Sequence, residues 1–159
     1  MTRERFIELA TAEQEALRRF LLALCGGNRA EVEDMAQDTL VKAYMASGGY
    51  VERYKFRTWL FRIGYRTFLD NRKRQRPQPM PDGVDIQSAS ASDDAFRYEE
   101  LYAAIRQLPE KTRAAVLLYH FDGYSVREIA QITRSNPVAV RQHLSRGLRA
   151  LRRLLEGEK

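Results

Sequence analysis

Apolar residues recur at intervals of three and four positions along most of the chain, which is the spacing of one face of an α-helix. The first such segment covers residues 3–24, with Thr2 before it as a cap and Gly26-Gly27 after it as a stop. The pattern therefore predicts an all-α fold. The same periodicity predicts further helices over residues 30–46, 55–75, 98–107 and 110–121.

One segment breaks this periodicity. Residues 76–93 read RPQPMPDGVDIQSASASD and contain three of the five prolines, a Ser/Ala run and almost no apolar repeat. As a flexible coil, about 18 residues span roughly 20–25 Å. We therefore expect two small helical domains, residues 1–75 and 96–159, joined by a flexible linker over residues 76–95.

The C-terminal part carries the signals of a helix-turn-helix. Residues 125–128 read Ser-Val-Arg-Glu, which matches an S-x-x-E capping box at the start of a short helix. Asn136 followed by Pro137 marks the start of a longer helix. Arg134 stands where the turn of such motifs usually has glycine, yet we expect the motif to form because Asn136 and Pro137 define the next helix start.

The second helix of this motif presents two different faces. Its outward face has Gln and Arg side chains, which pair with base edges in the major groove of DNA, and no carboxylate. A purely structural helical hairpin is the alternative. We expect the inward side to be Val140, Leu144, Gly147, Leu148 and Leu151, and the outward face with its flanks to be Val138, Arg141, Gln142, Ser145, Arg146 and Arg149.

The helix predicted over residues 30–46 is apolar on one side and mixed on the other. The mixed side sets two apolar residues among carboxylates and amides, which suits docking of a basic, partly apolar helix. Single exposed apolar residues on an ordinary surface are the alternative, which the pattern leaves open. This mixed side comprises Asp34, Gln37, Asp38, Val41 and Met45.

The helix predicted over residues 55–75 has a core side around Trp59 and a second, aromatic side with Phe61, Tyr65 and Phe68. A strip with Arg62, Arg66 and Lys73 flanks both sides. Basic side chains beside aromatic ones suit phosphates and unstacked bases. Packing of the aromatic residues against the first helix is the alternative, and for Tyr65 the two are evenly balanced.

Charge is distributed in a way that supports nucleic-acid binding. The 159 residues include 27 Lys and Arg against 21 Asp and Glu, so the net charge is +6. The excess is local, with net +7 over residues 52–76 and net +5 over residues 134–159. Two basic blocks separated by acidic stretches indicate two contacts with one polyanion, and they leave acidic surfaces for another partner.

Other features narrow the class of protein. A single cysteine, Cys25, excludes an internal disulfide, and His120 and His143 are too few to build a zinc site with it. Without a His, Cys and acid constellation an enzyme is unexpected, and we expect no cofactor or metal. No apolar run approaches the roughly 18 residues of a membrane span, and no signal peptide begins the chain, so we expect a cytoplasmic protein without membrane insertion.

Five motifs in sequence order resemble the extracytoplasmic-function (ECF) sigma factors of bacterial RNA polymerase. They are Glu33 to Thr39 (EDMAQDT), Phe56 to Ile63 (FRTWLFRI), Asp70 to Arg74 (DNRKR), Leu108 to Arg113 (LPEKTR) and Tyr124 to Ala130 (YSVREIA).

The resemblance implies that residues 1–75 are sigma region 2 and residues 96–159 are sigma region 4. The docking stripe of Asp34, Gln37 and Asp38 then falls where the family contacts the clamp helices of the largest polymerase subunit, and the flap of the second-largest subunit is a further expected contact. The second helix of the helix-turn-helix falls where the family reads the −35 promoter element. The −10 element would be read and opened by the loop 47–54 together with Tyr65, Arg66, Asp70, Asn71, Arg72 and Lys73.

Such a chain is expected to be a non-enzymatic specificity subunit that associates with the nucleoid when bound to polymerase and with an anti-sigma factor when inactive. A ligand-sensing repressor is the main alternative, but the +7 block in the N-terminal part is unexpected for a sensor domain.

Overall fold

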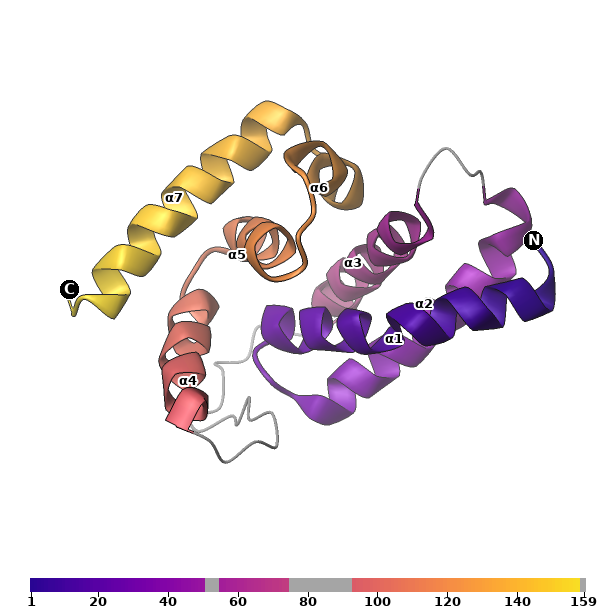
Figure 1. The fold of residues 1–159 in the computed structure, drawn as a ribbon, viewed down its shortest axis with the longest axis horizontal. Coiled ribbons are helices and arrows are strands. Elements are labelled where there is room, and N and C mark those ends of the chain that lie inside the picture. Colours follow the sequence, from indigo (N-terminus) through magenta and orange to yellow (C-terminus); the bar gives the residue numbers. More distant parts are fainter. Residues whose placement is uncertain (51–54, 75–92, 158–159) are drawn as a thin grey trace.

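The computed structural model describes residues 1–50, 55–74 and 93–157, and these residues form helices and short connections without a strand (Figure 1). The predicted all-α fold is thus confirmed for the described residues. The chain segments 51–54 and 75–92, which hold part of the predicted loop and most of the predicted linker, lie outside them. The helices are α1 Arg3–Cys25, α2 Arg29–Ala46, α3 Phe56–Arg74, α4 Asp93–Arg106, α5 Glu110–Val116, α6 Val126–Thr133 and α7 Pro137–Leu155.

Helices α1 to α3 form the N-terminal domain, and α4 to α7 form the C-terminal domain (Figure 1). Thr2 caps α1 as predicted, since its hydroxyl accepts a hydrogen bond from the backbone N–H of Arg5 at 3.1 Å. Gly26 ends α1 in the left-handed conformation, with φ of 87°. Both ends of the first helix therefore follow from the sequence.

A glycine lets the three N-terminal helices meet closely. A Cβ atom on Gly64 of α3 would lie 2.7 Å from the Leu17 side chain of α1 and 3.5 Å from the Thr39 side chain of α2. Leu17 and Thr39 are themselves fully buried. Gly64 is therefore the point where α3 touches both of its neighbours, and a larger residue there would separate them.

The C-terminal domain uses a second glycine in the same way. A Cβ atom on Gly147 of α7 would lie 2.6 Å from the Val116 side chain and 3.0 Å from that of Thr112, both from α5. Because Gly147 faces α5 so closely, the next residue is turned away by about 100°. Leu148 is accordingly 43% exposed, so the prediction that it lies on the inward side of α7 is wrong.

The helix-turn-helix forms as predicted. The Ser125 hydroxyl accepts from the N–H of Glu128 at 3.1 Å, and the Glu128 carboxylate accepts from the N–H of Ser125 at 3.0 Å. Asn136 caps α7, with Pro137 at its first position. Arg134 takes the left-handed conformation with φ of 54°, so the turn forms without the usual glycine. The buried Ala130 and Val140 lie at the expected core positions of the two helices.

Two boundaries differ from prediction. Helix α4 begins at Asp93, five residues before the expected start and inside the segment assigned to the linker. The sequence there has two consecutive aspartates, a residue type that favours the first turn of a helix. The helix expected over residues 110–121 changes after Val116 into a π-helical segment, Leu117–Phe121.

The two domains pack against each other, which the sequence did not predict. Helix α3 lies along α6, and α1 contacts α4, α5 and the π-helical segment. Arg113 of α5 is buried at this junction, where it donates to the Leu24 carbonyl at 2.6 Å and to the carbonyls of Arg106 and Leu108. Leu24 belongs to the last turn of α1, whose carbonyls have no partner within the helix. The C-terminal domain therefore caps a helix of the N-terminal domain.

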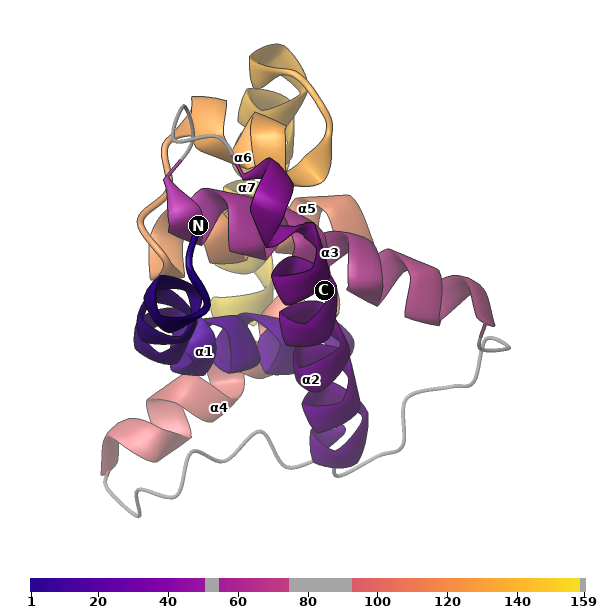
Figure 2. The same ribbon diagram turned by 90° about the vertical axis from the view of Figure 1, so that its right-hand side faces the viewer.

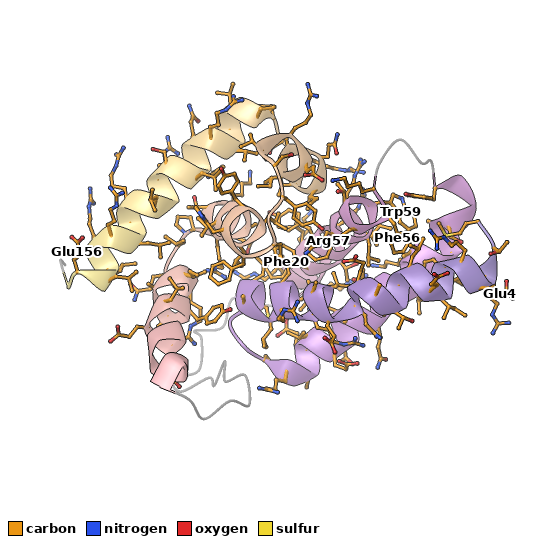
Figure 3. The ribbon with its side chains drawn as sticks, in the orientation of Figure 1. Glu4, Phe20, Phe56, Arg57, Trp59 and Glu156 are labelled. Atoms are coloured by element: carbon orange, nitrogen blue, oxygen red, sulfur yellow. The ribbon has the colours of Figure 1, made fainter. Side chains whose placement is uncertain are left out.

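Arg57 of α3 is a second connection between the domains, and Figure 3 shows it near Phe20 in the middle of the molecule. Its Nε atom lies 3.2 Å from a Glu13 carboxylate oxygen, and its Nη2 lies 3.5 Å from a carboxylate oxygen of Asp122. The guanidinium carbon lies 4.9 Å from the ring centre of Tyr124. One arginine of the N-terminal domain is thus held by a carboxylate and an aromatic ring of the C-terminal domain.

Asp122 makes the stability of this arrangement depend on pH. Burial raises the pKa of its carboxyl from 3.8 to about 6; the positive charges of Arg57 and Arg19 oppose this rise, and Glu13 adds to it. The folded chain therefore binds this proton more tightly than the unfolded chain. The resulting stabilisation is complete below pH 3.8 and is lost as the pH rises through about 6.

We expect Asp122→Asn to remove this loss, because an amide stays neutral at every pH. Between about pH 4.5 and 7 the variant should gain about 1–2 kcal/mol in free energy of unfolding relative to the unchanged chain. Urea denaturation across this range measures the difference. Parallel curves for the two proteins would show that the Asp122 carboxylate is not destabilised by its surroundings.

Candidate nucleic-acid and protein-binding surfaces

The predicted stripe on α2 is a surface and not part of the core. All five of its residues are exposed, with Val41 at 59% and Met45 at 80%, whereas Met35 and Ala36 on the opposite side of α2 are buried. Asp38 forms an ion pair with Lys42 at 3.1 Å. We call Asp34, Gln37, Asp38, Val41 and Met45 the α2 stripe.

Sequence analysis missed one member of this surface. Tyr44 is 46% exposed and lies three positions after Val41, with its ring 5.3 Å from that of Phe6 on α1. Helical spacing from Val41 was the signal that could have found it. With Tyr44 included, the surface has three apolar side chains beside its carboxylates.

The outward face of α7 is also confirmed as a surface. All of its predicted residues are exposed, and Val138 at the start of the helix is 61% exposed. Helix α7 has no Asp or Glu between Pro137 and Leu155. We call this set the α7 face: Val138, Arg141, Gln142, Ser145, Arg146 and Arg149.

Two further cations lie near the start of α7. Arg127 in the first turn of α6 and Arg134 in the turn between the helices are both exposed. In a helix-turn-helix the first helix crosses the DNA backbone, so basic side chains there suit phosphates. Their positions on either side of the motif's short helix could have indicated this from the sequence.

The predicted residues near the end of α3 lie in different environments. Arg66, Arg72 and Lys73 are exposed, whereas Asp70 and Asn71 are half-buried. The side-chain amide of Asn71 donates to a Glu31 carboxylate oxygen of α2 at 3.0 Å, so it connects two helices of its own domain. Three cations of this set are therefore open to solvent, and Asn71 has a structural contact in addition.

Tyr65 is not on the surface in this structure. It is 3% exposed and its ring lies 6.2 Å from that of Phe68. Burial raises the pKa of its hydroxyl to about 12, and the carboxylate of Glu110 on α5 adds to the rise. Tyr65 is therefore buried, and in this arrangement it cannot stack on a base.

Phe61 decides between the two interpretations of the aromatic side of α3. Its ring stacks on Phe20 of α1 at 5.4 Å, which confirms packing against the first helix. It also lies 5.3 Å from the ring of Tyr124 in the C-terminal domain. The aromatic side of α3 is thus an interface between the domains as well as part of the core.

The half-buried Trp59 contacts Tyr50 at 5.2 Å and Phe56 at 5.6 Å between ring centres, as expected for a residue at the core side of α3. Residues 51–54 of the predicted DNA-binding loop lie outside the described residues, so its role stays a prediction.

The helices that carry the α2 stripe and the α7 face lie far apart in the molecule. In Figure 2 α2 lies at the front of the molecule and α7 behind it, and Figure 1 places these helices in different halves.

In the described part of the chain, no group of three or more His, Cys, Asp or Glu side chains is placed to hold a metal ion. None of the helices over those same residues is long and apolar enough to cross a membrane.

Comparison with known families assigns both domains. Residues 9–78 match Sigma-70 region 2, and residues 98–151 match Sigma-70, region 4. The ECF RNA polymerase sigma factor SigW of Bacillus subtilis is 31% identical over 145 residues, covering 81% of this chain and 78% of SigW. The RNA polymerase sigma-H factor of Pseudomonas aeruginosa is 28% identical over 142 residues, covering 79% of this chain and 74% of that protein.

Solved structures agree with this assignment. The sigma factor RpoE, in complex with the anti-sigma factor NepR from Bartonella quintana, superposes with a TM-score of 0.80 at 27% identity and covers 98% of this chain and 99% of RpoE. CnrH in complex with the cytosolic domain of CnrY has the same fold, with a TM-score of 0.76 at 23% identity over 99% of this chain and 92% of CnrH. The sequence matches and the solved structures agree: both sigma domains occur in the right order, and the fold is shared over nearly the whole chain. The chain belongs to the ECF sigma factors, which are promoter-specificity subunits of bacterial RNA polymerase.

Proposed function

We propose that this sigma factor binds core RNA polymerase through region 2 and directs it to two-part promoters, with the α7 face reading the −35 element and α3 reading and helping to open the −10 element. The observation that carries the proposal is the presence of two basic surfaces on two domains, separate from the acidic and apolar α2 stripe.

The α7 face supports the −35 assignment by its chemistry. Gln142 and Arg146 are exposed and can pair with adenine and guanine edges in the major groove. The exposed cations Arg127 and Arg134 suit contacts with the flanking phosphates. In a helix-turn-helix, the second helix, here α7, usually contacts the bases, and the first helix, here α6, usually contacts the DNA backbone.

The end of α3 supports the −10 assignment through its charge. Arg66, Arg72 and Lys73 are exposed cations, and Tyr65 beside them can stack on an unpaired base once it is uncovered. In the arrangement described above, Tyr65 is buried, so it must be uncovered before it can stack on a base. We propose that region 4 moves away from α3 when the −10 element is read.

The α2 stripe supports the polymerase assignment. Apolar side chains ringed by carboxylates suit a basic partner helix, which is the chemistry expected of the clamp helices of the largest polymerase subunit. Region 4 would contact the flap of the second-largest subunit. The solved structure of RpoE contains the anti-sigma factor NepR, and we propose that an anti-sigma factor also controls this chain.

Each DNA-binding domain is small, so we expect neither to bind a promoter tightly alone. Gel shifts with and without core enzyme test this, using probes mutated in either element. The isolated chain should bind weakly and with little sequence preference, and core enzyme should confer specificity. Tight binding of the free chain to a palindromic site would instead indicate a repressor.

Within the polymerase complex, Gln142→Ala or Arg146→Ala should weaken binding by about 1–3 kcal/mol, because each removes one contact to a base edge. The effect should disappear on probes whose −35 element is already mutated. Probes mutated in the −10 element should still show it. An equal effect on all probes would assign both side chains to phosphate contacts.

For the α2 stripe, Asp34→Lys with Asp38→Lys should weaken binding to core enzyme by a few kcal/mol through charge reversal. The free energy of unfolding should change by less than about 0.5 kcal/mol, because both side chains are exposed. Pull-down and thermal melting measure the two effects. Glu4→Lys with Glu8→Lys on α1 makes the same charge change elsewhere and should leave binding intact.

For α3, Arg66→Gln or Lys73→Gln should reduce the slope of log affinity against log salt by about one unit, because each substitution leaves one promoter phosphate without its cation. Holoenzyme binding to a labelled promoter between about 0.05 and 0.3 M salt measures the slope. Arg3→Gln removes a cation from the exposed start of α1 and should leave the slope unchanged. An unchanged slope in the α3 variants would remove these residues from the DNA interface.

A further inference from the structure

Region 4 contributes a carboxylate to each of three contacts with α3, two in the first turn of the helix and one near its end. Glu128 lies near the start of α3, Asp122 lies beside Arg57, and Glu110 lies near the end of the helix. These contacts fall on the helix that carries the +7 block of the sequence. We call them, with the ring of Tyr124, the interdomain latch.

At the start of α3, the Glu128 carboxylate makes contacts within its own domain and with α3. One carboxylate oxygen accepts from the N–H of Ser125 in the capping box of the helix-turn-helix. The other accepts from the Thr58 hydroxyl at 3.2 Å and lies 3.9 Å from the Lys55 ammonium. Burial alone would raise the pKa of Glu128, but the hydrogen bonds from Ser125 and Thr58 and the charge of Lys55 outweigh it and lower the pKa. The charged form is therefore favoured in this contact.

At the end of α3, Glu110 pairs with a cation that the proposed function assigns to a promoter phosphate. Its carboxylate oxygen lies 3.1 Å from Nε of Arg72, one of the cations proposed to contact the −10 element. The same carboxylate is close enough to raise the pKa of Tyr65, which burial raises most. Glu110 thus pairs with an arginine of α3 and brings a negative charge near the buried Tyr65.

In the middle of the latch the contact is mostly apolar. The ring of Tyr124 lies against Phe61 and under the Arg57 guanidinium. The Tyr124 hydroxyl is buried and has no hydrogen-bond partner among the described residues. Closing the domains therefore gains ring packing here and loses the hydration of one hydroxyl.

Contact with region 4 covers one of the three binding surfaces and leaves the other two exposed. The α2 stripe and the α7 face remain accessible while the aromatic side of α3 is covered. Polymerase can therefore engage the closed chain before the −10 reading surface is available. A partner that holds the two domains apart would then uncover it.

We propose that region 4 masks the −10 reading side of α3 in the free chain, with Glu110 placed as a substitute for a promoter phosphate and the Thr58–Glu128 contact holding the other end. The proposal rests on the proposed function for what α3 binds. Half-exposed ion pairs contribute little each, so the latch can be opened by modest differences in affinity.

Two substitutions that leave the charge unchanged test the latch in opposite directions. Thr58→Val removes the hydrogen bond to Glu128 and should favour the open state. Tyr124→Phe removes a hydroxyl that only the open state hydrates, and it should favour the closed state. Because neither changes a charge, a change in DNA affinity cannot come from altered attraction to phosphate.

The open fraction can be measured without DNA by single-molecule energy transfer in the full chain. Dyes are attached at Glu15→Cys on α1 and Arg153→Cys on α7, both on the surface, in a Cys25→Ala background. Thr58→Val combined with Glu110→Gln should raise the open population at least about fivefold. Glu156→Gln makes the same charge change as Glu110→Gln at an exposed site outside the latch and should leave the population unchanged.

Binding of a fluorescent oligothymidine of about 20 nucleotides to unlabelled chain then reports access to α3. Affinity should rise about fivefold in the Thr58→Val, Glu110→Gln variant relative to Glu156→Gln, which makes the same charge change, and fall about two- to threefold in Tyr124→Phe, in proportion to the open fraction. Adding Arg66→Gln and Lys73→Gln should abolish the gain, since it arises on α3.

The outcomes separate the latch from the proposed function. An unchanged open population in both latch variants would overturn the latch itself. A larger open population without a gain in oligothymidine affinity would overturn the masking of α3, while promoter selection by the holoenzyme is tested by its own gel shifts.

Discussion

The burial of Phe61 between Phe20 of α1 and Tyr124 of region 4 is the contact on which the arrangement of this sigma factor depends. Phe61 is fully buried, and its ring is shared by the core of region 2 and the boundary with region 4. An apolar side chain of this size gains about 1.5–3 kcal/mol from burial, and part of that gain here requires the second domain. The side of α3 that carries it is consequently covered in the free chain.

Charged groups complete this interface and make it reversible. Arg113 donates to the Leu24 carbonyl of α1, and Arg57 is held by Glu13 and Asp122 under the Tyr124 ring. Burial of such groups has a cost that their partners only partly offset, as the raised pKa of Asp122 shows. An interface of this kind fixes one arrangement of the domains without being strong enough to resist a large partner such as polymerase.

The three proposed binding surfaces thus differ in whether a partner can reach them in this arrangement of the domains. The α2 stripe and the α7 face are accessible, whereas the aromatic side of α3 is covered. This order matches the sequence of events in the proposed function, in which polymerase binding precedes contact with the opened −10 element. A specificity subunit with this property would not bind single-stranded DNA well before it joins the enzyme.

Local chemistry in the sequence determined the helices, their caps, the helix-turn-helix and the sides of α2 and α7. Hydrophobic spacing and capping side chains act over three or four residues, so Thr2, Glu128 and Asn136 could be interpreted without the fold. The ECF resemblance likewise came from short motifs in order. Only the tertiary structure determined that Tyr65 is buried and Leu148 is exposed, because the exposure of each side chain depends on which helix packs beside it. Periodicity can show that a helix has a second apolar side, but it cannot say whether that side meets a base, the first helix or another domain. Here it meets Tyr124, 63 positions away from Phe61 along the chain.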